Sequence, residues 1–238
     1  DPLEYGKLLV GKTILSSKGY GMFVDFYLSG NVIMNIGDGV SARYYNPGDK
    51  VPANYQLLLT FKDESFLVFT VAMYGFISAY PDAVIDNKYY TISRESISPL
   101  SDAYTEAEFE KLFAFAKKTL TAKALLATEQ RIPGVGNGVT QDILFNAGIH
   151  PKQKVFDLSD GQKGVLFKSL KDTLMAMTSG RGRDTQTDLY GNEGGYKTIL
   201  SSKTWKNPCP RCGSVIVKEA YLGGSVYYCS ECQKIRKT

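Results

Sequence analysis

Two stretches in the first part of the chain alternate apolar and polar positions over short runs. They are GMFVDFYLSGNVIMNIG at residues 21–37 and YQLLLTFKDESFLVFTVAMYGFISAY at residues 55–80. Both are rich in Val, Phe, Tyr and Ile, and they break at the turn sequences Ser-Gly-Asn and Lys-Asp-Glu-Ser. Several hairpins in series, with no helical period between them, predict an antiparallel β-sandwich or barrel that ends near residues 90–104.

A helical period begins at Thr105. Residues 105–120, TEAEFEKLFAFAKKTL, open with a capping box of Thr105 and Glu108 and carry apolar residues at helical spacing. Further helices are expected over residues 121–129, over residues 139–148 and from Ser159 onward. The glycine-rich stretch 179–198 predicts a mobile loop, either a linker or a lid. Strands followed by helices place the chain in the α+β class.

Charge is divided unevenly along the chain, whose net charge is +4. Residues 1–102 carry 8 Lys and Arg against 11 Asp and Glu, a balance of −3, whereas residues 103–238 carry 20 against 13, a balance of +7. Residues 196–238 alone hold 8 basic and 2 acidic residues. A basic half indicates a polyanion as partner, and a merely solubilising surface is the alternative.

All four cysteines lie within NPCPRCGSVIVKEAYLGGSVYYCSEC, residues 207–232. Cys209 and Cys212 form one C-x2-C pair, and Cys229 and Cys232 form a second one sixteen residues later. Two such pairs suit a tetrahedral Zn²⁺, whereas two disulfides are typical of small, cysteine-dense secreted domains. We expect no secretory leader and no membrane span, which would need about 20 apolar residues. The prediction is one structural Zn²⁺ per chain, because four thiolates leave no open position for substrate.

The loop PGVGNG, residues 133–138, lies between two expected helices. Its glycines would let the backbone approach a ligand and free the amide groups at a helix start, where the helix dipole favours phosphate. Asn137 adds a neutral donor. The alternative is a glycine C-cap followed by an asparagine N-cap that simply joins two helices. The loop by itself leaves both interpretations open.

The stretch KALLATEQRIPGVGNGVTQDILFNAGIHP, followed by CPRCG and YYCSECQ near the C-terminus, resembles the formamidopyrimidine-DNA glycosylase and endonuclease VIII family. The resemblance covers residues 105–238 and includes the helix-two-turns-helix motif and the zinc finger. It implies a base-excision repair enzyme in which a β-sandwich and a helical domain flank a basic cleft. Duplex DNA would lie across that cleft with the damaged nucleotide flipped out of the stack.

The resemblance also implies the domain organisation and the DNA contacts. Residues 1–102 would form an antiparallel β-sandwich that is incomplete at its N-terminus, residues 103–195 the helix-two-turns-helix domain with the glycine-rich loop, and residues 196–238 the zinc-finger β-hairpin. In the family, a lysine and the asparagine of the glycine loop contact phosphates near the lesion, and these are Lys123 and Asn137 here. Further candidate DNA contacts are Gly136, Arg181, Arg183 and Lys234.

Several family residues are not matched. Family members begin at a proline whose secondary amine attacks C1′ of the flipped sugar and forms a Schiff base, and a glutamate follows it. Here Pro2 is not terminal and is followed by Leu3, so we expect the catalytic start to be absent and assign no catalytic residue. Three other replacements concern DNA: Gly224 stands for the arginine of the hairpin tip, Asp38 for a methionine that fills the void, and Met73 and Tyr74 for an arginine and phenylalanine wedge.

Three residues are interpreted as structural. His150 is the only histidine, so no second one is available for a triad. Trp205 is expected to pack between the zinc module and the helical domain. Asp142 is expected to favour the dipole of its helix.

The leading hypothesis is a bacterial-type DNA glycosylase and AP lyase that acts on oxidised bases in duplex DNA. We expect a monomer in the cytoplasm, associated with the nucleoid and not with a membrane, and we expect the chain as given to be inactive. The first alternative is a catalytically silent relative that binds damaged DNA. The second is a zinc-ribbon nucleic-acid module with no link to damage.

Overall fold

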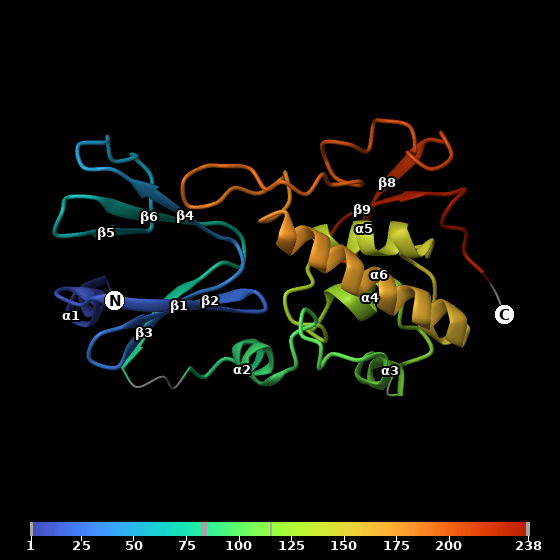
Figure 1. The fold of residues 1–238 in the computed structure, drawn as a ribbon, viewed down its shortest axis with the longest axis horizontal. Coiled ribbons are helices and arrows are strands. Elements are labelled where there is room, and N and C mark those ends of the chain that lie inside the picture. The colour runs from blue at the N-terminus through green and yellow to red at the C-terminus, as the bar shows by residue number, and fades with distance from the viewer. Residues whose placement is uncertain (1, 82–84, 115, 237–238) are drawn as a thin grey trace. The chain divides into compact units, whose positions relative to one another are not determined.

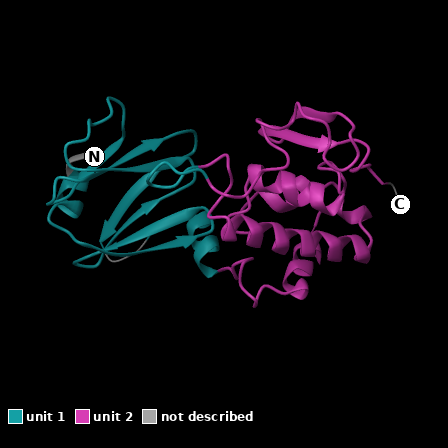
Figure 2. Ribbon diagram, turned by 45° about the horizontal axis from the view of Figure 1, so that its top comes forward, with its two compact units in different colours: residues 1–95, 187–193 teal, residues 96–186, 194–238 magenta. Residues whose placement is uncertain are grey.

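A computed structural model of the chain describes residues 2–81, 85–114 and 116–236. Figure 1 shows the order of the elements along the chain, and Figure 2 distinguishes two compact units. Unit 1 contains residues 1–95 and 187–193, and unit 2 contains residues 96–186 and 194–238. Each unit has a hydrophobic core of its own.

Unit 1 is built from two antiparallel sheets, with strand orders β1-β2-β3-β7 and β4-β6-β5. The strands are β1 (Ile14–Tyr20), β2 (Phe23–Leu28), β3 (Val32–Ile36), β4 (Val40–Tyr45), β5 (Leu57–Thr60), β6 (Phe66–Val71) and β7 (Ile77–Pro81). Side chains from both sheets share one core, in which Met34 and Phe69 are fully buried. The sequence left a sandwich or a barrel open, and the structure confirms the sandwich.

The other face of the first sheet is covered as well, by helix α2 (Lys88–Glu95). Asp25 of β2 and Asn35 of β3 are fully buried there. The Asp25 carboxylate accepts hydrogen bonds from Asn35 Nδ2 at 2.6 Å and from the Tyr90 hydroxyl at 2.6 Å. Burial and the neighbouring carboxylate raise the pKa of Tyr90. Asp25, at a position that alternation assigns to solvent, is therefore satisfied inside unit 1, whereas Asn35 Oδ1 has no partner among the described residues.

Two further segments belong to unit 1. Helix α1 (Pro2–Leu9) packs Leu8 and Leu9 against the sandwich core. The tip of the glycine-rich loop, residues 187–193, lies along β4, where Tyr44 N donates to Leu189 O at 2.8 Å.

Unit 2 contains four α-helices in the described residues, packed around one core. They are α3 (Glu106–Ala114), α4 (Ala122–Ala127), α5 (Asn137–Ala147) and α6 (Asp160–Ser179), with a 3-10 turn, η1 (Val155–Asp157), before α6. Leu125 of α4, Ile143 of α5 and Leu170 of α6 are all fully buried in this core. The helical period read from the sequence is therefore the pattern of the core-facing positions.

Caps explain where these helices begin and end. Ser159 forms a complete capping box with Gln162 at the start of α6, and Gly148 ends α5 in the left-handed conformation with φ 66°. The helix expected over residues 105–120 is shorter in the structure, where α3 ends at Ala114. Leu120 lies outside it, and its carbonyl oxygen accepts a hydrogen bond from Val155 N. Helix α5 begins earlier than expected, because the extended residue Gly136 is its N-cap.

The C-terminal part of unit 2 is a two-stranded hairpin of β8 (Ile216–Tyr221) and β9 (Gly224–Cys229). Its turn uses two residues with positive φ, Leu222 at 49° and Gly223 at 73°. Side chains of the hairpin share a small core with α5 and with Leu200. In the part of the chain that the structure describes, no helix combines the length and the apolar character that crossing a membrane requires.

Candidate functional site

The four cysteines converge at the base of the β8–β9 hairpin. Their sulfur atoms all lie within 4.8 Å of one another. Sγ of Cys209 is 3.9 Å from Sγ of Cys232, and Sγ of Cys212 is 3.5 Å from Sγ of Cys229. Disulfide sulfurs would be about 2.05 Å apart, so these are four free thiols.

The sulfur geometry fits a tetrahedral zinc site. Four thiolates at about 2.3 Å from Zn²⁺ would place their sulfurs about 3.8 Å from one another. The two sulfur pairs, at 3.9 and 3.5 Å, lie on either side of that spacing. Every position of a tetrahedron would be taken by sulfur, so such an ion would have no vacant position for a reactant.

Glutamine side chains dock the hairpin onto the helices. Gln141 of α5 is almost fully buried, and its amide pairs with two backbone groups of β9: Nε2 donates to Ser225 O at 3.0 Å and Oε1 accepts from Tyr227 N at 3.1 Å. Gln233, also buried, accepts from Cys229 N at 2.9 Å and donates to Ile149 O at 2.9 Å. Gln141 thus holds the hairpin against α5, and Gln233 holds it against Ile149.

The glycine loop leads directly into the first turn of α5. Gly136 is the N-cap and offers no side-chain acceptor, so the first amide groups of the helix lack an intrahelical partner. Asn137 Nδ2 donates to Ser225 O at 3.1 Å. Gly224 lies close by, since a Cβ built there would be 3.2 Å from Asn137 Nδ2. Asn137 therefore sits between a helix start and the hairpin turn.

Lys123, the other expected phosphate contact, lies at the opposite side of the same turn. Its Nζ donates to Tyr221 O and lies 5.6 Å from the centre of the Tyr221 ring. Only 2% of Lys123 is exposed, and burial lowers the pKa of its ammonium group. Lys123 and Asn137 are thus brought to the two residues, Tyr221 and Ser225, that flank the hairpin turn.

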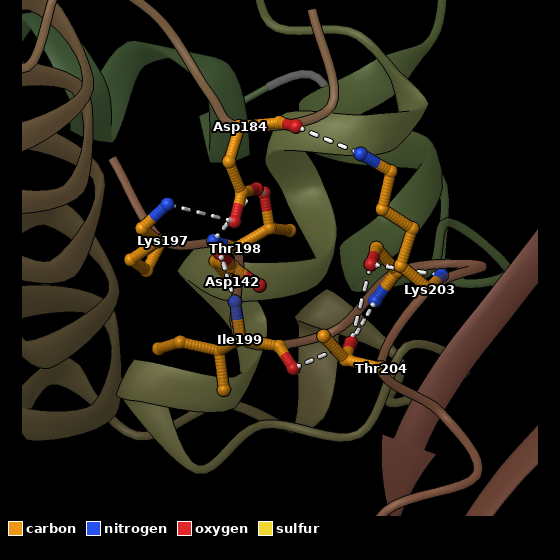
Figure 3. Close-up of polar contacts among 8 residues, drawn as sticks. Asp142, Asp184, Lys197, Thr198, Ile199, Lys203 and Thr204 are labelled. Atoms are coloured by element: carbon orange, nitrogen blue, oxygen red, sulfur yellow. Dashed lines mark hydrogen bonds and ion pairs between the residues drawn. The ribbon is translucent and has the colours of Figure 1, made fainter. Parts of the chain in front are cut away.

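Two aspartates, the fully buried Asp142 and the half-buried Asp184, fix the base of the glycine-rich loop (Figure 3). Asp142 of α5 is fully buried and accepts from Ile199 N at 3.0 Å and from Leu200 N at 2.8 Å. Asp184 accepts from Thr198 N at 3.2 Å and from the Thr198 hydroxyl at 2.7 Å. The expectation that Asp142 serves the helix dipole is corrected, because its carboxylate is consumed by these loop amides. Burial raises its pKa, and the two amide donors oppose that shift.

The remaining candidate cations are placed differently. Arg183 directly precedes Asp184 at the base of the glycine-rich loop, and it lies against Gly138 in the first turn of α5. Arg181 is exposed, with a positive φ of 55°. Lys234 is exposed and forms an ion pair with Glu231 at 3.0 Å. The structure thus brings Arg183 to the glycine loop, and it records no contact of Arg181 or Lys234 with that loop.

His150 and Trp205 both have packing partners in unit 2. His150 is buried, its Nδ1 accepts from Lys152 N at 3.0 Å, and its ring lies 4.2 Å from that of Tyr228. Trp205 packs against the core shared by the hairpin and Leu200. Both structural interpretations agree with these contacts.

No family model matches the chain. Individual relatives do. It is 28% identical to the formamidopyrimidine-DNA glycosylase of Mycoplasma mobile over 98% of this chain and 85% of the relative. It is 26% identical to the enzyme of the same name from Cytobacillus firmus, over 98% of this chain and 86% of the relative.

Proteins named formamidopyrimidine-DNA glycosylases are thus similar to the chain over nearly its whole length. Solved structures with this name or its abbreviation Fpg share its fold. The Lactococcus lactis protein bound to DNA with an abasic site matches with a TM-score of 0.81 and 22% identity, over 98% of this chain and 86% of that one. The MutM (Fpg) protein of Thermus thermophilus matches with a TM-score of 0.78 and 22% identity, over 97% and 86% of the two chains.

The two residues expected in place of the family wedge are highly exposed in unit 1. Met73 is 82% and Tyr74 93% exposed, on the turn between β6 and β7. This turn packs backbone to backbone against Gly39, since Ala72 N donates to Gly39 O at 2.7 Å. A Cβ at Gly39 would lie 2.8 Å from Met73 O, so glycine is required there. Asp38, which was expected in place of the void-filling methionine, is also exposed.

Sequence reasoning missed two residues of the candidate site. Gln141 had a usable signal, because it lies one helical turn after Asn137 and so shares its face. Thr185 carried none, because it lines a cavity that the sequence does not reveal. Gly138 belongs to the predicted glycine loop, but its contact with Arg183 was not predicted.

Proposed function

We propose that this protein is a DNA glycosylase of the formamidopyrimidine kind, which acts on oxidised bases in duplex DNA and has AP-lyase ability. The observation that carries the proposal is the convergence of Lys123, Asn137 and the glycine loop on one turn of the cysteine-bearing hairpin. Relatives that match almost the whole chain are named formamidopyrimidine-DNA glycosylases, which supports this function for the arrangement. The protein would work as a monomer on chromosomal DNA in the bacterial cytoplasm.

The four cysteines would hold one structural Zn²⁺, whose charge and bonds would fix the base of the hairpin. Lys123, Asn137 and Gly136 would then meet the phosphates on the side of the lesion, with Arg181, Arg183 and Lys234 as further contacts. Lys123 is buried against Tyr221 O, and one of its three N–H groups is used there. Its charge would act on the backbone of DNA from beneath the hairpin turn.

The chemical step is proposed more narrowly. No Pro-Glu pair occurs in the 238 residues, so the family nucleophile has no counterpart among them. We propose that these residues recognise damaged DNA and that Schiff-base chemistry needs an amine that they do not supply. The catalytically silent relative is therefore kept as the second candidate function.

The test follows an 8-oxoguanine duplex by mass spectrometry after incubation with the protein, alongside a binding assay on the same duplex. Loss of the base supports the glycosylase with its full activity. Binding that prefers the lesion without base loss supports the silent relative. If neither occurs, both candidate functions are wrong.

A further inference from the structure

Arg183 extends its guanidinium across the first turn of α5. The evidence is steric: a Cβ built on Gly138 would lie 2.3 Å from Arg183 Nη1 and 2.9 Å from Nη2. These distances are far shorter than van der Waals contact, so the absence of a side chain at position 138 is what admits the guanidinium. The loop base that carries Arg183 is held by Asp142 and Asp184 (Figure 3).

The guanidinium opens onto a cavity of about 210 Å³ within unit 2. Its lining includes Asn137, Gly138, Arg183, Thr185, Ser202 and Ser225. The Nε atom of Arg183 donates to Gln186 Oε1 at 3.3 Å. Neither terminal nitrogen donates to any residue that the structure describes, although an arginine has five N–H donors. The cavity is therefore rich in donors that lack acceptors.

An independent observation comes from Thr185. The residue lines the same cavity, and its Oγ1 atom is buried and has no hydrogen-bond partner among the described residues. A buried hydroxyl without a partner is costly, and such groups are normally satisfied. A ligand that offers acceptors would satisfy the hydroxyl, the guanidinium and the first amides of α5 together.

Arg183 forms no ion pair with Asp142 or Asp184, although both carboxylates attract its charge. The nearby Asp142 carboxylate is occupied by Ile199 N and Leu200 N, and Asp184 is occupied by Thr198. The ion pair recorded for Asp184 is with Lys197, at 4.0 Å. The hairpin turn contributes no cation, since its residues there are Leu222, Gly223 and Gly224.

We propose that Arg183, the first turn of α5 and the Thr185 hydroxyl form a pocket for one phosphate group of the bound DNA. The identity of the ligand rests on the proposed function, which makes DNA the polyanion at this loop. A phosphate group suits the hydrogen-bond donors of this pocket. Arginine pairs with phosphate through two N–H groups, and a helix start favours negative charge. Gly138 is then the residue that lets Arg183 reach the helix.

The test uses the whole chain and two single variants, with binding to a fluorescein-labelled abasic-analogue duplex measured by anisotropy over a salt series. Arg183→Ala should weaken binding by about tenfold or more, since a charge-assisted hydrogen bond is lost, and should reduce the salt slope by about one. Gly138→Ala should do the same by displacing the guanidinium. Alanine has the higher helix propensity, so this variant should remain folded.

The matched control is Gly161→Ala, which adds the same methyl group to the first turn of α6, where no atom lies within 4 Å. Its affinity should equal that of the wild type. The sharper test is the double variant: in an Arg183→Ala background, Gly138→Ala should have no further effect on binding. Two independent losses that add would show that the methyl group acts without Arg183, and would overturn the proposal.

Other outcomes separate this inference from the proposed function. If the wild type binds the duplex and Arg183→Ala binds within about twofold of it, the phosphate pocket is wrong and the proposed function stands. If the wild type does not bind duplex DNA at any salt concentration, both are wrong.

Discussion

At the residue scale, side-chain amides and carboxylates of unit 2 form hydrogen bonds with backbone groups of neighbouring elements. Gln141 and Asp142 are neighbours on α5 and serve different elements: Gln141 pairs with β9, and Asp142 holds the amides of Ile199 and Leu200. Both side chains are buried. The same helix thus positions the hairpin and the glycine-rich loop.

Asp142→Asn should lower the free energy of unfolding by about 1–3 kcal/mol, because the new amide group points an N–H at a backbone N–H and leaves a buried donor unpaired. Urea unfolding followed by circular dichroism measures this. Asp172→Asn on the exposed side of α6 is the control and should change stability by less than about 0.5 kcal/mol. Equal stability of the two variants would contradict the anchoring role.

Lys123→Ala should reduce the magnitude of the slope of log K against log salt by about one, because the proposed phosphate contact of one charge is removed. Lys168→Ala removes an exposed, ion-paired lysine from α6 and serves as the control. An unchanged slope for Lys123→Ala would show that this buried lysine only supports Tyr221 O.

Asn137→Ala should weaken DNA binding and leave the salt slope as it is, since asparagine carries no charge. The measurement is the same anisotropy series. Binding identical to that of the wild type would restore the simpler interpretation of PGVGNG as a helix connection.

At this scale the sequence predicted residue types better than their partners. The four cysteines were predicted as one cluster, because their spacing alone brings them together, and the structure confirms the cluster. The predicted role of Asp142 was wrong, because its hydrogen-bond partners, Ile199 and Leu200, lie far along the chain in a segment without periodicity. The contact between Arg183 and Gly138 could not be predicted for the same reason.

At the element scale, local signals account for most of the fold. Alternation predicted the sandwich strands, and Ser159 and Gly148 marked helix ends where the structure has them. The helix predicted from Thr105 extended to residue 120, whereas α3 ends at Ala114. Nothing in the sequence shows that Leu120 O accepts a hydrogen bond from Val155 N. The burial of Asp25 under α2 could not be predicted from the sequence either, because it depends on which helix covers the sheet.

The hairpin should depend on metal at its base. Cys229→Ser removes one of four thiolates, and structural zinc in small fingers is worth about 10–16 kcal/mol of apparent binding energy. We expect this variant to lose Zn²⁺, to expose Trp205 and to bind DNA more weakly. Metal analysis of fresh, reduced wild-type protein should give one Zn²⁺ per chain, and absence of zinc there would contradict the assignment.

At the scale of the whole molecule, the two compact units divide the expected tasks between them. Unit 2 contains the cysteine cluster, the glycine loop and the phosphate candidates, whereas unit 1 presents Met73 and Tyr74 at an exposed turn. The division into three parts at residues 102 and 195 stays a prediction.

The 238 residues should not form a borohydride-trappable adduct with abasic duplex. Lys18 is exposed on β1, whereas lysine nucleophiles are activated by desolvation in an apolar pocket or by a neighbouring cationic group. The α-amine of Asp1 lies outside the described residues. Denaturing gel electrophoresis after borohydride treatment is the measurement. A covalent band that is lost in Lys18→Ala would refute the prediction and identify the nucleophile.

The most direct test of damage recognition compares one labelled duplex with and without an abasic-site analogue, by anisotropy titration of the wild-type protein. We expect the lesion duplex to bind at least about tenfold more tightly, because an unpaired site costs less to open than an intact base pair. Equal affinity for the two duplexes, or no binding to either, would contradict the account.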